Sequence, residues 1–456
     1  MALSLLRHSL RTRFWIGASL LALAIATITA GNIFMPRPRS VGQSMLGYDF
    51  LAFYTAGHFL NTGQPENVYD LRALRAYQET EARRWGLELN GTYGPFWNPP
   101  FYAWLFRPLA RLTFPDALHL WWAINLACCT LALALLSRLL PDQLWKSAGL
   151  LVALVVVSLP FSQAFMHGQN TFTSLLVLSM AACLWLAAAR KHDRSGVPLD
   201  LLAGLVAGLM VYKPQLAMVV AGALAITLGR RAILGMLITG GGLVAASALF
   251  SPDLLADWLV RMPANLHRFQ ETNHYRWERH VTFNGFWRLL LQGHSLGPTS
   301  SAVWTLAGLS MLGIGAAIFN ALCRARRVLH CPDSTIEQRR TVARRTIAAT
   351  FLAMPLLMPF YFDYDLLLMA VPGALLAADL MEQRRDVAAD RWIVRAWTAF
   401  YLWTLLAPGL AGVLRVQLSV PLLAGLTLLQ CARVHRRADV VLPATTPEAQ
   451  PQSLAA

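Results

Sequence analysis

Long apolar blocks recur along the whole chain and are separated by short polar or basic segments. Each runs for about 17–22 residues, the length that a helix needs to cross a bilayer core. The predicted spans are 14–35, 118–140, 148–165, 171–189, 232–250, 302–322, 347–362, 366–381, 393–410 and 416–431. A soluble protein buries a few such runs but not this many, so the pattern predicts an all-α, polytopic transmembrane helical bundle of about 12 spans (range about 10–13).

Two apolar segments are too short to cross a membrane alone. They are 199–211 and 217–228, and they flank Tyr212-Lys213-Pro214-Gln215. A third, at 101–112, follows the break Trp97-Asn98-Pro99-Pro100. Interrupted helices of this kind occur where the backbone lines a cavity, so we expect a cavity near Lys213.

Two long loops, 36–116 and 251–300, lie between spans, and they carry Asp49 and the histidines of the segment 267–280. In the first, residues 50–60 are apolar, and apolar residues recur at helical spacing from Val68 to Trp85. We therefore expect short helices at the membrane interface in these loops. Residues 1–435 form one predicted integral-membrane domain, and the polar residues 436–456 form a predicted disordered cytoplasmic tail.

Composition agrees with this pattern and fixes an orientation. The 456 residues are 56% apolar and only 14% charged, with a net charge of +15. The lysines and arginines gather in the short loops of one side, which predicts that this side and both termini are cytoplasmic. The excess charge therefore needs no nucleic-acid partner. The run 14–35 is predicted to be an uncleaved anchor, with a cleaved signal peptide as the alternative, and the six cysteines show neither disulfide nor metal spacing.

The candidate functional residues all fall on the predicted outer side. Asp49 follows the first span, and its alternative role is the N-cap of a helix beginning at Phe50. Lys213 is a second candidate, and its alternative role is to snorkel to the interface. Gln169 and Asn170 are candidates that could instead form a plain turn, and His274, Arg276, Arg279 and His280 could instead form a solvated loop. Asp363 and Asp365 are weak candidates for a divalent metal site, with a polar turn as the alternative.

A carboxylate and several cations at the outer interface suit an enzyme that uses a lipid-linked phosphate. The cations neutralise the phosphate as it leaves, and the carboxylate accepts a proton from an attacking hydroxyl. Aromatic rings with polar groups stack on sugars, and Tyr54, Trp97 and Tyr275 are candidates for this role. The chain has no glycine-rich nucleotide-binding loop, and we expect neither a cofactor nor a structural metal.

Several short motifs, in order, resemble glycosyltransferase family 87. They are Tyr48-Asp49-Phe50 with Phe53-Tyr54 and Ala56-Gly57; Gly63; Val68-Tyr69; Asn98-Pro99-Pro100-Phe101; Phe106-Arg107-Pro108-Leu109-Ala110; Gly168-Gln169-Asn170; and Gly204 and Gly208 leading to Lys213-Pro214. The order and spacing match over about residues 14–290, and hydropathy alone matches beyond.

The resemblance implies a GT-C type fold and a polyprenyl-phosphate-sugar-dependent hexosyltransferase, often a mannosyltransferase, on the outer face of a bacterial inner membrane. It places the general base at Asp49. Lys213 and the His274–His280 loop are then expected to hold the donor phosphate, and Asn98, Gln169 and Asn170 to contact substrate. The expected acceptor is a lipid or a glycan. A transporter or flippase of lipid-linked sugars is the alternative, and an inactive family member is a third possibility.

Overall fold

The structure is a computed structural model that describes residues 46–86, 89, 93–140, 144–190, 198–272, 275–382 and 388–441. These residues form helices and connecting loops, without any strand, and their one bridge joins His280 to Phe362. The predicted all-α class is confirmed. The predicted anchor at 14–35, residue His274 and the end of the predicted tail from 442 onward lie outside the described residues.

Five segments are long and apolar enough to cross a membrane. They are α5 (Phe114–Ser137), α8 (Thr171–Arg190), α11 to α12 (Arg230–Phe250), α15 (Ser301–His330), and η7 with α17 (Asp363–Glu382). The predicted span 148–165 is instead two helices, α6 (Leu144–Val156) and α7 (Leu159–His167), bent by 60°. The bend occurs at Ser158, whose side chain caps α7. Counting this pair as one span gives six among the described residues, so about 12 spans stays a prediction.

The predicted interruption at Lys213 is confirmed. Helix α9 (Leu199–Gly208) continues into a 3₁₀ turn, η4 (Leu209–Tyr212), and α10 (Pro214–Leu228) begins directly after Lys213. Proline at the first position of α10 suits a helix start because its missing N–H would be unpaired there. The remaining long helices are α16 (Ile336–Ala353), α18 (Ala388–Leu414) and α19 (Ser419–Val441).

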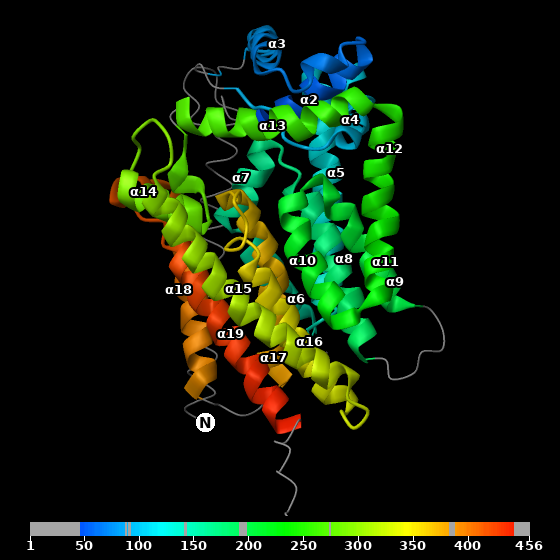
Figure 1. Cartoon of the computed structure of the whole chain (residues 1–456), viewed down its shortest axis with the longest axis vertical. Coiled ribbons are helices and arrows are strands. Elements are labelled where there is room, and N and C mark those ends of the chain that lie inside the picture. The colour runs from blue at the N-terminus through cyan, green and yellow to red at the C-terminus, as the bar shows by residue number, and fades with distance from the viewer. Residues whose placement is uncertain are drawn as a thin grey trace, which may run out of the picture.

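The helices of the two long loops gather at one end of the bundle, as Figure 1 shows. They are α2 (Tyr48–Asn61), α3 (Leu71–Arg84), α4 (Pro100–Phe106), α13 (Pro252–Thr272) and α14 (Phe283–Gln292). Helix α13 lies across the ends of the long helices, and α3 lies above it in this view. The prediction of helices within these loops is therefore confirmed, although α13, with 21 residues, is longer than expected, and their place at the membrane interface stays a prediction.

One predicted loop and the start of the predicted tail, both at the other end, are helical. The segment 324–345 separates the predicted spans 302–322 and 347–362 and is rich in arginine, so the pattern predicted a basic loop there, but α15 continues to His330 and α16 begins at Ile336. Two buried arginines of α16 pair with acidic residues: Arg344 with Glu382, and Arg345 with Asp379 at 3.0 Å. Similarly, α19 extends to Val441, so the start of the predicted disordered tail is helical.

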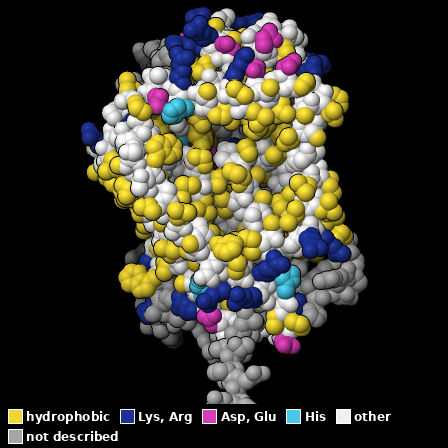
Figure 2. Space-filling view, viewed as in Figure 1, with side chains coloured by type: hydrophobic (Ala, Val, Ile, Leu, Met, Phe, Trp, Pro, Cys, Tyr) yellow, Lys and Arg dark blue, Asp and Glu magenta, His cyan; other side chains and the backbone are white. Residues whose placement is uncertain are grey.

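Hydrophobic side chains cover the middle of the molecule, between a mixed-charge end and an end rich in Lys and Arg (Figure 2). Large apolar side chains are exposed on the described helices, including Phe250 (76% exposed), Leu312 (70%) and Val413 (80%). Water does not favour such a continuous apolar surface, whereas a bilayer does. Together with the long apolar helices, this belt identifies a membrane protein.

Candidate functional site

A cavity of about 660 Å³ lies beneath α13, at the border between the apolar belt and the charged end. Figure 2 shows its mouth as a hollow in the belt, close below the charged end. Segments that are distant in the sequence line it: the start of α2, residues 93–98, the turn between α7 and α8, the break between η4 and α10, α13, and the segments 275–279 and 359–365.

Asp49 enters this cavity from the first turn of α2. The helix begins at Tyr48 rather than Phe50, and its N-cap is Gly47 in a left-handed conformation (φ 67°). The prediction that Asp49 itself is the N-cap is therefore wrong. As the second residue of the helix, its carboxylate benefits from the partial positive charge of the helix N-terminus. The Gly47 N–H donates to the carbonyl of Met166 (2.7 Å), which ties the start of α2 to α7.

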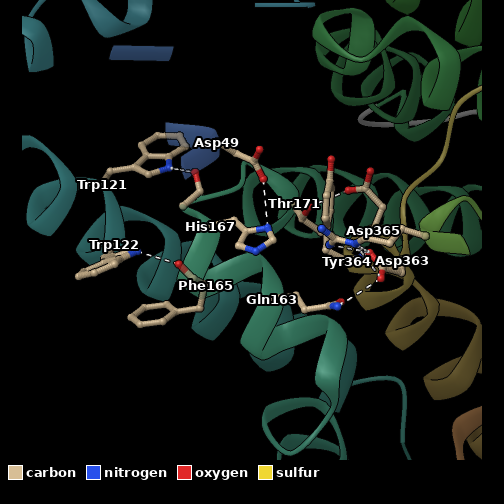
Figure 3. Close-up of polar contacts among 12 residues, drawn as sticks. Asp49, Trp121, Trp122, Gln163, Phe165, His167, Thr171, Asp363, Tyr364 and Asp365 are labelled. Atoms are coloured by element: carbon tan, nitrogen blue, oxygen red, sulfur yellow. Dashed lines mark hydrogen bonds and ion pairs between the residues drawn. The ribbon is translucent and has the colours of Figure 1, made fainter. Parts of the chain in front are cut away.

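His167, the last residue of α7, faces Asp49. Its Nδ1 lies 3.2 Å from Oδ2 of Asp49, as Figure 3 shows. Burial raises the pKa of Asp49, but hydrogen bonding and charge from His167, with contributions from Gln169 and Arg279, outweigh this and hold the pKa below its usual value. The carboxylate is 23% exposed and faces the cavity, so it is an ionised group with access to a ligand.

Helix α5 fixes both partners of this pair. Trp121 donates through Nε1 to the carbonyl of Gly168 (2.8 Å), next to His167, and its ring stacks on Phe50, next to Asp49. One residue further, Trp122 donates to the carbonyl of Phe165 (2.7 Å) (Figure 3). The relative position of the carboxylate and the imidazole thus depends on one rigid helix rather than on loop conformation.

Two cations that face the same cavity are each paired with a carboxylate at the start of η7, which begins at Asp363. Lys213 donates to Oδ1 of Asp365 (2.9 Å), which also accepts from Thr171 (2.6 Å). Arg279 donates through Nε and Nη2 to Asp363, at 2.8–3.1 Å. A charge-assisted, two-point contact of this kind holds a guanidinium plane in one orientation. Asp363 also accepts from Gln163, and Figure 3 shows this contact beside Tyr364.

The two acidic residues that the sequence suggested as weak metal ligands, Asp363 and Asp365, instead pair with cations. In the described part of the chain no group of three or more His, Cys, Asp or Glu side chains is placed to hold a metal ion. The arrangement positions Lys213 and Arg279 at the wall of the cavity, where they offer positive charge to an anionic ligand.

His280 lies behind the cavity wall rather than in it. It is fully buried, and its Nε2 lies 2.6 Å from the hydroxyl of Tyr275. Burial, and the nearby charge of Arg279, lower the pKa of His280 to about 3. The imidazole is therefore neutral and shares a hydrogen bond with the tyrosine hydroxyl, so this geometry does not support the predicted phosphate contact by His280. Its contact with Tyr275 supports a ring that does line the cavity.

The structure brings most of the other predicted residues together. Trp97, Asn98, Gln169, Asn170, Tyr275 and Arg276 all line the cavity. Tyr54 does not, because its ring packs on Phe114 and its hydroxyl donates to the carbonyl of Leu112 (2.8 Å). Its predicted role in stacking on a sugar therefore has no support here. His274 lies outside the described residues.

Sequence reasoning missed three residues of this site: His167, Gln163 and Tyr364. His167 ends an apolar run and directly precedes the Gly168-Gln169-Asn170 motif, which was a usable signal. Tyr364 lies between the two acidic residues and lines the cavity. Gln163 lies one helical turn before His167 on α7, and nothing in an apolar run indicated its contact with Asp363.

A comparison with known families matches a model described as glycosyltransferase family 87 over residues 96–335, which is more than half of the chain. Neither the curated proteins nor the solved structures contain a match to the chain. The matched stretch includes Asn98, the Gln169-Asn170 turn, Lys213 and Arg279, while Asp49 and the 363–365 turn lie outside it. The resemblance seen in the sequence motifs is thus confirmed at the level of the family, and the chain belongs to glycosyltransferase family 87.

Proposed function

We propose that this membrane glycosyltransferase moves a hexose, with mannose as the first candidate, from a polyprenyl-phosphate donor to a lipid or glycan acceptor. The observation that carries the proposal is a single cavity that opens in the apolar belt and is lined by the carboxylate of Asp49 and by three cations, Lys213, Arg276 and Arg279. A lipid-linked sugar phosphate fits such a cavity, because its apolar tail can remain in the hydrocarbon of the bilayer while its phosphate contacts the positively charged side chains.

Asp49 is the proposed general base. Its carboxylate takes the proton from an acceptor hydroxyl, whose oxygen then forms a bond to the anomeric carbon of the donor sugar. The bond between that carbon and the phosphate oxygen breaks in the same step, and the polyprenyl phosphate leaves with the bonding electrons. A single displacement from the opposite face inverts the anomeric configuration. His167 keeps Asp49 ionised and oriented.

Lys213 and Arg279 are the proposed phosphate contacts. Positive charge already fixed by the protein stabilises the charge that develops on the leaving phosphate without reorganisation during the reaction. Asp365 and Asp363 hold these cations at the cavity wall in the absence of donor. Arg276 also lines the cavity and is exposed, so it is the third candidate for this contact.

The route of the donor follows from the lining of the cavity. Met218 of α10 and Met262 and Leu266 of α13 lie on its wall, and the mouth opens in the hydrophobic belt of Figure 2. Flexible methionine side chains adapt to an irregular apolar chain. A polyprenyl tail entering sideways from the bilayer would keep its phosphate at the height of Lys213.

The membrane arrangement proposed with this function is a GT-C type bundle of about 12 spans in a bacterial inner membrane. Both termini lie in the cytoplasm, and the helices α2, α3 and α13 lie outside. The Lys- and Arg-rich end in Figure 2 supports this orientation because positive residues favour the cytoplasmic side. Labelling of a single cysteine placed at Arg83 of α3 tests it: access only from the cytoplasmic side would invert the arrangement.

An assay with purified protein in lipid nanodiscs tests the activity. Radiolabelled polyprenyl-phosphate mannose and membrane extract are supplied, and transfer by the wild type is compared with transfer by Asp49→Asn. We expect transfer by the wild type, with inverted configuration in the product, and a large loss in the variant. Wild-type rates in a folded Asp49→Asn protein would remove Asp49 from the mechanism, and movement of donor across vesicles without transfer would favour a flippase.

A further inference from the structure

A second hollow, of about 230 Å³, lies at the outer end of the molecule between α3 and α13. Three arginines line it: Arg72 and Arg75 from α3 and Arg268 from α13. The described residues give Arg72 and Arg268 no acidic side-chain partner. The nearby Asp70 is turned toward the helix start, where it accepts from the backbone N–H groups of Arg72 and Ala73.

Arg75 is held differently from the other two. Its Nε donates to Glu79 (2.7 Å), and its guanidinium lies 5.8 Å from the ring centre of Tyr93. Three guanidinium groups with one adjacent carboxylate leave an excess of positive charge in the hollow. Arginine presents a planar pair of donors that fits phosphate and carboxylate groups, so the hollow favours an anionic ligand.

The hollow and the catalytic cavity share a wall made of aromatic rings. Tyr93 and Phe269 line both of them. Their rings meet edge to face at 5.7 Å, and Phe269 also meets Trp97 at 6.0 Å. Aromatic faces with a polar edge are suited to stacking on sugar rings, so this wall is a suitable surface for a sugar that extends from one hollow into the other.

The backbone brings the hollow close to the proposed base. Gly94 directly follows Tyr93, and a Cβ added at Gly94 would lie 3.4 Å from Ala52 Cβ and 3.5 Å from the carbonyl of Tyr48. Both neighbours belong to α2, within three residues of Asp49. Consecutive Cα atoms are about 3.8 Å apart, so a two-residue segment connects the arginine-lined hollow to the first turn of α2.

We propose that this hollow is an acceptor subsite and that the acceptor carries a negatively charged group, a phosphate or a carboxylate. The inference rests on the proposed transferase function and specifies its acceptor. Arg72, Arg75 and Arg268 hold the charged group, the sugar extends over Tyr93 and Phe269, and its hydroxyl reaches Asp49. The donor enters from the apolar belt below α13, and the acceptor enters from the aqueous side above it.

A binding experiment tests the charge preference without requiring turnover. Wild-type protein in neutral phosphatidylcholine nanodiscs is titrated with mannose 6-phosphate and with mannose. We expect at least tenfold tighter binding of the phosphorylated sugar and loss of that preference in Arg72→Gln/Arg268→Gln. Arg83→Gln removes a charge from α3 outside the hollow and is the matched control. Equal binding of the two sugars, or an equal loss in the control, overturns the proposal.

A transfer experiment tests the acceptor role. Octyl mannoside and its 6-phosphate are offered as acceptors with radiolabelled polyprenyl-phosphate mannose. We expect the wild type to have a lower acceptor KM for the phosphorylated acceptor, and the double variant to raise that KM about tenfold with an unchanged donor KM. Transfer that does not distinguish the two acceptors overturns the proposal, whereas the absence of transfer to any acceptor contradicts the proposed function itself.

Nanodiscs that contain phosphatidylglycerol separate the two sources of an anionic group. A lipid headgroup in the hollow would compete with mannose 6-phosphate. Competition by this lipid, combined with no advantage for the phosphorylated acceptor in neutral nanodiscs, would show a headgroup site and overturn the acceptor role. An advantage for the phosphorylated acceptor that persists in both lipid mixtures supports it.

Discussion

Lys213 and Asp365 are separated by 152 positions in the chain, yet Nζ of the lysine lies 2.9 Å from Oδ1 of the aspartate. The lysine comes from an interrupted helix, and the aspartate comes from the turn that opens η7. Both side chains are less than 10% exposed. A buried cation needs such a partner, and this contact uses one of the three donors of the ammonium group of Lys213, which lines the cavity.

This relationship predicts unequal effects for the two residues. Lys213→Met removes a charged donor, and we expect kcat/KM for the lipid-phosphate donor to fall about 10- to 100-fold. Asp365→Asn keeps the lysine in the cavity and should lose less than tenfold. Because Lys213→Met leaves Asp365 buried without its cation, Lys213→Met/Asp365→Asn is the matched variant for folding. Equal losses in both single variants would assign the pair a purely structural role.

The length and charge of the base provide a second prediction. Asp49→Asn keeps the shape of the side chain but cannot accept a proton, so kcat should fall about 10²- to 10⁴-fold. Asp49→Glu keeps the charge and displaces it along the cavity, so we expect an intermediate rate. Initial rates at saturating donor measure both. A glutamate variant that is no better than asparagine would show that position matters as much as charge.

The dependence of the reaction on pH provides a third prediction. The pKa of Asp49 is lowered, so the base stays ionised and kcat/KM should be constant from neutral pH down to the usual pKa of aspartate, near about 4. Activity is lost only as the pH falls through the lowered pKa. In His167→Gln the opposing effect of burial remains while the imidazole is gone, so the acid limb should move to higher pH.

The control for this experiment is His280→Phe. His280 is neutral and contacts Tyr275 rather than Asp49, so its loss should change the rate without moving the acid limb. An acid limb that stays in place in His167→Gln would mean that His167 does not set the ionisation of Asp49. Rates measured between pH 3.5 and 7, with donor stability followed in parallel, distinguish these outcomes.

Much of the architecture was predictable because it follows from local pattern. The apolar blocks, the break at Lys213-Pro214 and the amphipathic helix α3 each depend on residues close in sequence. The grouping of Asp49, Lys213 and Arg279 also followed, since alternating spans place polar loops on one side. Hydropathy and charge alone therefore predicted that these three residues lie at the same end of the helical bundle.

The pairings within that group were not predictable. The contact between Asp49 and His167 depends on how α5 packs against both α2 and α7, and no local pattern encodes that packing. The prediction of a loop at residues 324–345 was wrong for another reason. A run of arginines normally indicates a solvated loop, but Arg345 is buried because Asp379, from a later helix, compensates its charge. In both cases the decisive partner is distant in the sequence.

The glycine after His167 provides the last prediction. Gly168 has φ +67°, and a Cβ added there would lie 2.7 Å from the Cβ of Phe50, next to Asp49. Gly63 has nearly the same backbone conformation (φ +71°), and a Cβ added there would have nothing within 4 Å, so it is a matched control.

Gly63→Ala should cost about 1–2 kcal/mol of stability from the left-handed conformation alone. Gly168→Ala carries the same cost and must also displace α2 or α7. We therefore expect a larger fall in melting temperature and, in addition, a lower kcat that Gly63→Ala does not share. Similar effects of the two substitutions on kcat would show that the contact between Gly168 and Phe50 does not position the base.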